Sequence, residues 1–232
     1  MDNSRFSLTF LVLTLLFCVC LIVSNLMEIK VVDLGVITIT AGMVVFPLSY
    51  IISDCIVEIY GFARARLVIW LGFAMNLLVT LLLQVGLWLP GAEEWTGQEA
   101  MGLVFGAVPR IFCASFAAFI CGSMVNAYVM SVLKRKSDPE SRHSSRSFSV
   151  RAIVSTLWGE SVDSLVFFPL AFAGVLPWGL IVKLMITQAL LKTAYEIIIL
   201  PVTLRAVNRL RRIEGGDVTD DESLSYKWWK LR

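Results

Sequence analysis

The chain has 232 residues, of which 57% are hydrophobic and 16% are charged, with a formal net charge of +2. A soluble domain is usually about 45–50% apolar, so this excess, gathered in long uninterrupted runs, indicates a membrane protein. The length allows one helical domain and excludes a separate soluble domain of any size. Because positive and negative charges nearly balance, their placement along the chain is more informative than their total.

A membrane-spanning helix needs about 20 consecutive apolar residues, and six segments of the chain meet this requirement. They run over residues 6–28, 41–62, 66–89, 107–133, 151–174 and 178–204. We expect these segments to form one all-α transmembrane domain over residues 1–212, followed by a cytoplasmic tail over 213–232. Residues 30–42 are too short to span a membrane, and their alternating pattern predicts a small β-hairpin on the outer side.

Basic residues occupy alternate connections between the segments. They precede the first segment, fill the tight second connection at Arg64 and Arg66, crowd residues 134–151, and follow the sixth segment from Arg205. The intervening connections carry Glu28, Lys30 and Asp33, then Glu93, Glu94 and Glu99, and then no charged residue. Because positive residues mark the cytoplasmic side, both termini are predicted to be cytoplasmic. An even number of spans is required for this agreement.

The five cysteines give no sign of a disulfide framework or of a zinc site. All of them lie inside apolar runs, at Cys18, Cys20, Cys55, Cys113 and Cys121. Their spacing matches no metal-binding pattern, so we interpret them as small buried hydrophobic residues. We expect the protein to use neither a metal nor another cofactor.

The fifth segment, residues 151–174, carries Glu160 and Asp163 near its middle. A carboxylate at bilayer depth costs at least ~2.5–3.5 kcal/mol on insertion scales, so it is rarely present without a function. Residues three apart in a helix share one face. The segment is therefore predicted to form one wall of a polar site inside the membrane.

Acids on other segments fall at a similar depth. At ~1.5 Å per residue, Asp54, Glu160 and Glu196 each lie about 14 Å from a cytoplasmic basic residue, near the middle of a ~30 Å hydrocarbon core. Glu58 shares a helical face with Asp54, and Lys192 shares one with Glu196. These acids are predicted to converge on one level of the membrane.

Two interpretations of these polar residues stay open. In one, Lys192 and Arg110 neutralise some of the acids in structural ion pairs, and the aromatic residues serve packing alone. In the other, the acids outnumber the nearby cations, so at least one acid needs a proton or a ligand. The candidate binding residues are Glu160, Asp163, Asp54, Glu196, Lys192, Glu58, Arg110, Asn25, Tyr50, Trp158 and Phe167.

Several motifs in this sequence resemble the vitamin uptake transporter family, and together they cover most of residues 24–205. The motifs are Ser24-Asn25-Leu26 with Lys30, Gly42 followed by FPLSYIISDCIVEIYGFARAR over 46–66, Arg110 with Ala114-Ser115, Arg151 through Ser155, Gly159-Glu160, Val162-Asp163-Ser164 and Phe172, and Lys192 through Glu196 with Pro201. The run over 46–66 is the most specific of them.

The resemblance implies a six-helix inner-membrane transporter, not an enzyme. It implies import of the 7-deazaguanines 7-cyano-7-deazaguanine (preQ0) and 7-aminomethyl-7-deazaguanine (preQ1), which are salvaged to make the tRNA base queuosine. It also implies a fold similar to the substrate-binding components of energy-coupling-factor vitamin importers. The expected partners are the small-molecule substrate and the lipid bilayer, with no nucleic acid.

Three functional interpretations follow. The first segment, residues 6–28, lacks the small-residue pattern with which energy-coupling-factor components dock an ATPase module. A solitary transporter, as a monomer or a homodimer, is therefore preferred over such a component. A membrane-embedded enzyme built on paired acids is the least favoured, because no histidine lies in a predicted helix.

The chemistry of a 7-deazaguanine agrees with the candidate residues. Its guanine-like edge offers N1–H and an exocyclic amine side by side, and one carboxylate accepts both in a strong bidentate contact. Glu160 is the first choice for this contact, and Asp54 or Glu196 is the second.

Overall fold

The computed structural model describes residues 7–136 and 145–214, which form long helices and one short hairpin. The elements are α1 Leu8–Met27, β1 Val31–Asp33, β2 Thr38–Thr40, the 3-10 helix η1 Ala41–Val44, α2 Phe46–Trp88, α3 Gln98–Phe105, α4 Val108–Lys136, α5 Ser145–Phe172 and α6 Trp178–Glu214. The prediction of a mostly helical protein is confirmed. The predicted tail lies outside the described residues from position 215 onward.

The predicted hairpin between the first two segments is also confirmed. Ser7 begins α1 by accepting a hydrogen bond from the Phe10 amide, and the chain leaves the helix at Glu28. Strands β1 and β2 then pair antiparallel, with Val31 opposite Thr40. The hairpin returns the chain to the end of α1, where η1 packs before α2 begins.

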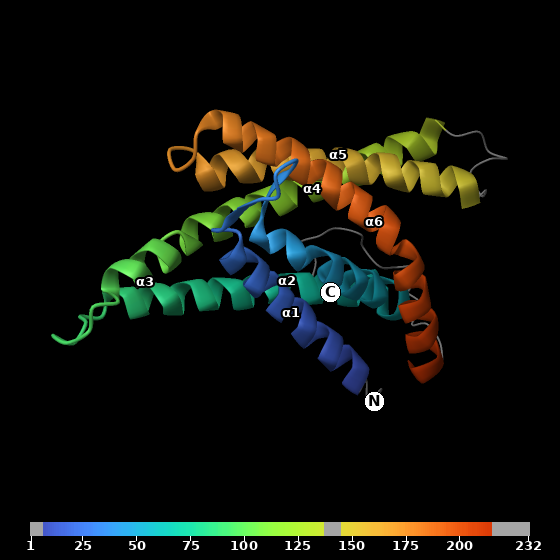
Figure 1. Cartoon of the computed structure of the whole chain (residues 1–232). Helices are drawn as coiled ribbons and strands as arrows, with labels where there is room; N and C mark the ends of the chain where they lie inside the picture. Colours follow the sequence, from blue (N-terminus) through green and yellow to red (C-terminus); the bar gives the residue numbers. More distant parts are fainter. Residues whose placement is uncertain (1–6, 137–144, 215–232) are drawn as a thin grey trace.

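Helix α2 consists of two helices that meet at Gly61, which has φ 80° and ψ 169°. They correspond to the two helices predicted over 41–62 and 66–89, but no separate loop joins them. A positive φ is readily adopted by glycine because it has no Cβ. Figure 1 shows the first half of α2 running toward one end of the bundle and the second half running back toward α3. The expected connection is therefore a kink at one residue.

Helices α4 and α5 pack closely because two glycines face each other across their interface. A Cβ on Gly122 would lie 2.9 Å from the Gly159 carbonyl oxygen, and one on Gly159 would lie 2.8 Å from the Asn126 Cβ. Small residues allow helix backbones to approach in this way. Helix α6 lies along α5 and bends away in its second half (Figure 1), where Pro201 interrupts the helical hydrogen bonding.

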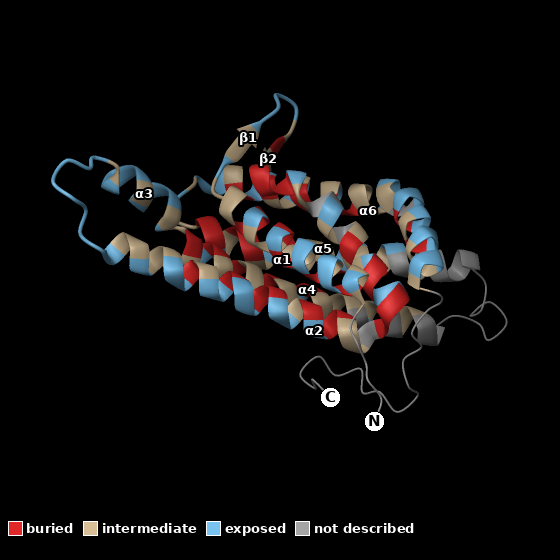
Figure 2. Cartoon of the chain, turned by 90° about the horizontal axis from the view of Figure 1, so that it is seen from below, coloured by how far each residue is buried: buried red, intermediate tan, exposed pale blue. Residues whose placement is uncertain are grey.

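The buried residues form two apolar clusters on the inner faces of the helices (Figure 2). One cluster surrounds Ile56 and Ile59, and includes Phe10 of α1 and Val207 of α6. The other surrounds Phe168, with Ile111 and Leu184 among its members.

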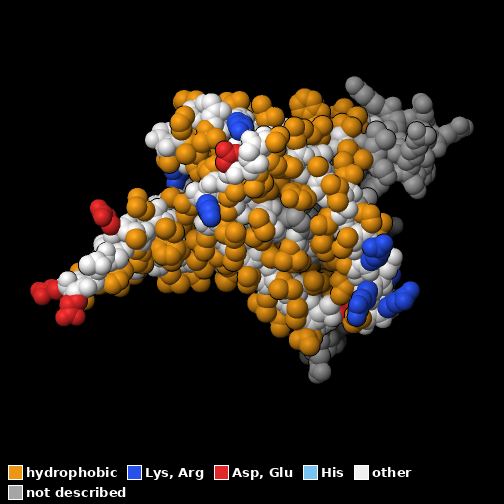
Figure 3. All heavy atoms as spheres, in the orientation of Figure 1, with side chains coloured by type: hydrophobic (Ala, Val, Ile, Leu, Met, Phe, Trp, Pro, Cys, Tyr) orange, Lys and Arg blue, Asp and Glu red, His pale blue; other side chains and the backbone are white. Residues whose placement is uncertain are grey.

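The outer surface is mostly apolar, as Figure 3 shows for one face. Large side chains such as Leu15, Leu82 and Ile198 are more than half exposed. Soluble monomers rarely expose apolar patches of this extent. Among the described residues, three segments are long and apolar enough to cross a membrane, namely Leu8–Met27, Ala63–Trp88 and Gln98–Asn126. The chain is therefore a membrane protein.

Candidate functional site

A cavity of about 220 Å³ lies between α1, the second half of α2, α4, α5 and α6. Its wall combines polar groups from several helices with aromatic rings. The lining residues are Leu21, Asn25, Glu28, Phe73, Ser115, Phe119, Gly122, Ser123, Asn126, Thr156, Gly159, Glu160, Asp163, Phe167, Phe168, Gln188 and Lys192.

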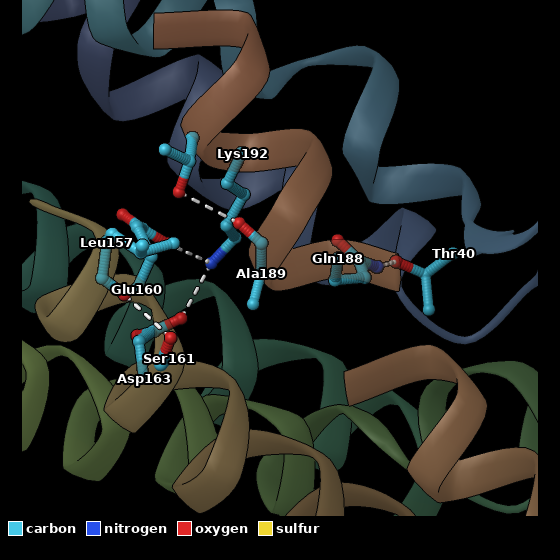
Figure 4. A network of polar contacts seen from close by, with 9 residues as sticks. Thr40, Leu157, Glu160, Ser161, Asp163, Gln188, Ala189 and Lys192 are labelled. Atoms are coloured by element: carbon cyan, nitrogen blue, oxygen red, sulfur yellow. Dashed lines mark hydrogen bonds and ion pairs between the residues drawn. The ribbon is translucent and has the colours of Figure 1, made fainter. Parts of the chain in front are cut away.

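An ion-pair cluster of three charged side chains occupies one part of the wall. The ammonium of Lys192 on α6 lies 3.1 Å from Glu160 Oε2 and 2.6 Å from Asp163 Oδ2, both on α5. Figure 4 shows the lysine pointing between the two carboxylates. Charge-assisted bonds of this kind are strong, and a buried charge without such a partner would be costly. The cluster therefore joins α6 to α5 beside the cavity.

A second polar group lies one helical turn away, where α6 meets the end of α1 and the hairpin. Gln188 Nε2 donates a hydrogen bond to Thr40 Oγ1, which the close-up in Figure 4 also shows. The Glu28 carboxylate lies beside the Thr40 hydroxyl. Asn25 precedes Glu28 by three residues, which places both on one side of α1. All of these side chains are buried.

The rest of the wall is largely aromatic. Phe73, Phe119, Phe167 and Phe168 line the cavity, and the rings of Phe167 and Phe168 meet edge to face at 5.1 Å. Aromatic rings of this kind stack on flat ligands. A few convergent polar groups in an otherwise apolar pocket are typical of small-molecule sites.

The charge of the lining is unbalanced. Among the described residues, the cavity is lined by three carboxylates, Glu28, Glu160 and Asp163, and by one ammonium, Lys192. Such a wall favours a ligand with several N–H donors or with a positive charge. In residues 7–136 and 145–214, no cluster of His, Cys, Asp or Glu is arranged to hold a metal ion.

Five of the predicted binding residues lie at this cavity. They are Asn25, Glu160, Asp163, Phe167 and Lys192. The structure therefore brings together residues from the first, fifth and sixth predicted segments.

The remaining predicted residues lie elsewhere. Glu58 is exposed and pairs with Arg211 at 3.1 Å. Arg110 donates to the carbonyl oxygens of Leu170 and Ala173, at the end of α5. Trp158 is 57% exposed and faces away from the cavity lining.

Of the three acids predicted to converge, Asp54, Glu160 and Glu196, only Glu160 lines the cavity. Glu196 accepts a hydrogen bond from the Thr156 hydroxyl at 3.2 Å. Asp54 itself is exposed on α2. Tyr50 lies in α2, and its side chain is outside the described part of the chain.

Sequence analysis missed Glu28, Thr40 and Gln188 as site residues. Glu28 was assigned to an outer connection because it follows the last apolar residue of the first segment. Its spacing from Asn25 was the available signal, since residues three apart share a helical face. The Thr40 contact depends on the fold of the hairpin and has no local sequence pattern.

Comparisons with known proteins now identify the family. A family model described as putative vitamin uptake transporter matches residues 40–206. The chain belongs to this family. The matched residues include α2, α4 and α5, and the part of α6 that carries Lys192. No solved structure matches the chain at a significant level.

Individual relatives of this chain carry more specific descriptions. A probable queuosine precursor transporter of Bacillus subtilis (strain 168) is 32% identical over 178 residues, covering 77% of this chain and 76% of that protein. A queuosine precursor transporter of Escherichia coli (strain K12) is 31% identical over 147 residues, covering 63% of this chain and 61% of that protein. A probable queuosine precursor transporter of Haemophilus influenzae is 28% identical over 133 residues, covering 57% of this chain and 52% of that protein.

Proposed function

We propose that this protein imports the queuosine precursors preQ0 and preQ1 across the inner membrane for salvage into tRNA. The observation that carries the proposal is the cavity, which combines three carboxylates and one ammonium with four phenylalanines. A 7-deazaguanine is flat and rich in N–H donors, so it suits both features. The descriptions of the relatives support the same substrate class.

The two precursors differ in the group that they carry on the five-membered ring. The aminomethyl group of preQ1 is a cation that a carboxylate of the ion-pair cluster accepts. The nitrile of preQ0 is an acceptor to which Lys192 donates. Because Glu160, Asp163 and Lys192 lie together, the cluster accommodates either substituent. Both precursors are therefore proposed as substrates.

The proposed topology has six membrane crossings, with both termini in the cytoplasm. Figure 1 shows the start of α1, the kink of α2 and the end of α6 toward one end of the bundle, with α3 and the α5–α6 connection at the other. Lys and Arg side chains gather near the first end, whereas Asp and Glu side chains mark the tip of the second (Figure 3). In the sequence, the exposed Arg209 belongs to the last part of α6, and Glu93 and Glu94 lie between α2 and α3. Positive residues favour the cytoplasmic side.

The proposed mechanism is that of a carrier. A binding site inside the membrane that opens alternately to either face is the usual transporter arrangement. The ion-pair cluster links α5 to α6, so a ligand that competes for Lys192 or its carboxylates changes the contact between these helices. Transport then follows from the difference in ligand affinity between the two orientations of the site.

The experiment that tests the proposal is rescue of queuosine in a bacterium that neither makes nor imports its precursors. The chain is expressed, preQ0 or preQ1 is fed at low concentration, and queuosine in tRNA is read by boronate-gel mobility. Restored queuosine is expected, and the two feeds rank the substrates. No rescue, with the protein shown to be in the membrane, would contradict import by this protein alone.

The host also separates a solitary transporter from a subunit of an energy-coupling-factor importer. A host that lacks such ATPase modules supports rescue only if the protein works without them. Rescue that appears only when an ATPase module is supplied would assign the protein to the importer class instead.

A further inference from the structure

Three buried polar groups at one end of the cavity have no hydrogen-bond partner within the described chain. They are the Asn25 amide nitrogen Nδ2, Glu28 Oε2 and Gln188 Oε1. The three side chains are 4%, 3% and 1% exposed, respectively, and all line the cavity. Because unsatisfied buried polar groups are costly, a cluster of them beside a cavity indicates that a ligand completes their bonding.

The orientation of the Gln188 amide follows from its hydrogen bond to Thr40. Gln188 Nε2 donates to Thr40 Oγ1, which places the amide nitrogen on the Thr40 side. The oxygen Oε1 is left as a free acceptor. The cluster thus offers one donor at Asn25 and acceptors at Glu28 and Gln188.

This pattern is complementary to the guanine-like edge of a 7-deazaguanine. That edge presents an acceptor at O6 and donors at N1–H and the 2-amino group, in this order. The amide of Asn25 matches O6, the carboxylate of Glu28 matches N1–H and the 2-amino group, and Gln188 Oε1 takes the remaining amino hydrogen. An acid that accepts from two adjacent N–H groups makes a strong contact.

We propose that Glu28, with Asn25 and Gln188, recognises the guanine-like edge of the substrate. This inference rests on the proposed function. It moves the contact from Glu160, which is already bonded to Lys192 at 3.1 Å, to a carboxylate whose Oε2 has no partner among the described residues. The ion-pair cluster is then left for the substituted five-membered ring.

The test measures binding of two bases that differ only in the 2-amino group, 7-deazaguanine and 7-deazahypoxanthine. Purified full-length protein in lipid nanodiscs is titrated with each base by calorimetry. We expect the wild type to prefer the 2-amino base by about 10- to 100-fold, the range of a hydrogen bond to a charged group. Glu28→Gln should remove most of this preference, while Glu99→Gln, on exposed α3, should keep it.

A second variant keeps the test decisive if Glu28→Gln does not fold. Gln188→Met has nearly the same shape and removes the Oε1 acceptor, so it should reduce the preference for the 2-amino base. Its matched control is Gln84→Met, because Gln84 bonds to the Phe105 carbonyl outside the cavity lining. Size-exclusion profile and melting temperature show which variants are folded.

The outcomes separate the inference from the function on which it rests. A wild type that binds neither base, with a normal melting profile, would overturn both. If the wild type prefers the 2-amino base and folded Glu28→Gln keeps the same preference, the role of Glu28, Asn25 and Gln188 is overturned and the proposed function stands. If only Gln188→Met folds, the same preference in that variant has the same consequence.

Discussion

The ammonium of Lys192 on α6 lies 2.6 Å from the carboxylate of Asp163 on α5, beside the cavity. Glu160, one turn earlier on α5, lies 3.1 Å from the same ammonium. One cation thus holds two acids that would otherwise repel each other. The same three groups form part of the wall of the cavity that we propose as the binding site, so we expect stability and binding to depend on them together.

Replacing this lysine should affect both properties. Lys192→Met leaves two carboxylates without their cation, and breaking a buried ion pair in this way costs about 3–5 kcal/mol. We expect a lower melting temperature in detergent and little precursor uptake. The double variant Lys192→Met/Asp163→Asn removes one of the two charges and should recover part of the lost stability. A double variant no more stable than the single one would contradict the pairing.

The close contact between α4 and α5 predicts a steric effect at Gly159. In Gly159→Ala the new methyl group would lie 2.8 Å from the Asn126 Cβ and 3.1 Å from the Gly122 carbonyl oxygen. Overpacking of this kind costs about 1–3 kcal/mol, and it should shift Glu160, the next residue of α5. Thermal unfolding and precursor uptake should both decline.

Gly86→Ala is the matched control for this variant. A Cβ at Gly86 meets only the Met101 Cε, at 3.5 Å, which is an ordinary contact. Alanine is favoured over glycine inside a helix by about 0.5–1 kcal/mol, so Gly86→Ala should be neutral or slightly stabilising. Equal melting temperatures for the two variants would argue against a tight α4–α5 interface.

Glu28 should be displaced by a substitution at Gly42. A Cβ at Gly42 would clash with the Glu28 carboxylate and lie 2.8 Å from the Ser24 carbonyl oxygen. We expect Gly42→Ala to weaken precursor binding by about tenfold or more, because the carboxylate loses its position. Gly102→Ala is the control, since a Cβ there meets nothing within 4 Å. Unchanged affinity in folded Gly42→Ala would mean that Glu28 does not contact the ligand.

Arg110 should support the fold without contacting the substrate. Its guanidinium donates to the Leu170 carbonyl at 2.7 Å and to the Ala173 carbonyl, where α5 ends. Because the side chain is exposed, Arg110→Gln should lower stability by only about 1 kcal/mol and leave the dissociation constant for preQ0 unchanged. A large loss of affinity with unchanged stability would return Arg110 to the binding site.

Local sequence patterns were sufficient to predict most of the fold. Runs of apolar residues predicted the positions of the long helices, and strand-like alternation predicted the hairpin. The prediction placed the break in α2 a few residues after Gly61, because the basic residues Arg64 and Arg66 are typical of a connection between two membrane helices. In the structure these residues continue the helix, and the change of direction needs only one positive φ.

The candidate site was predictable where it depends on helical spacing. Glu160 and Asp163 share a face, and Phe167 follows Glu160 by two turns, so all three reach the cavity. Trp158 lies two residues before Glu160, and residues two apart do not face the same side. This rule, applied more strictly, would have placed Trp158 on the outer surface.

The rest of the site depends on contacts between distant segments. Arg110 bonds to carbonyl groups 60 or more positions away, and Glu28 is buried by a hairpin and by α6. No periodic pattern marks either relationship. Depth along a helix placed Asp54, Glu160 and Glu196 at one level, but depth alone does not determine which of them faces the cavity.

Uptake of labelled preQ0 and preQ1 into vesicles that contain only the purified protein tests the central claim most directly. The account predicts saturable uptake by the wild type and by Glu99→Gln, and a strong reduction in folded Glu28→Gln and Lys192→Met. Vesicles with correctly folded wild-type protein that take up neither precursor, or cavity variants that transport as well as the wild type, would contradict it.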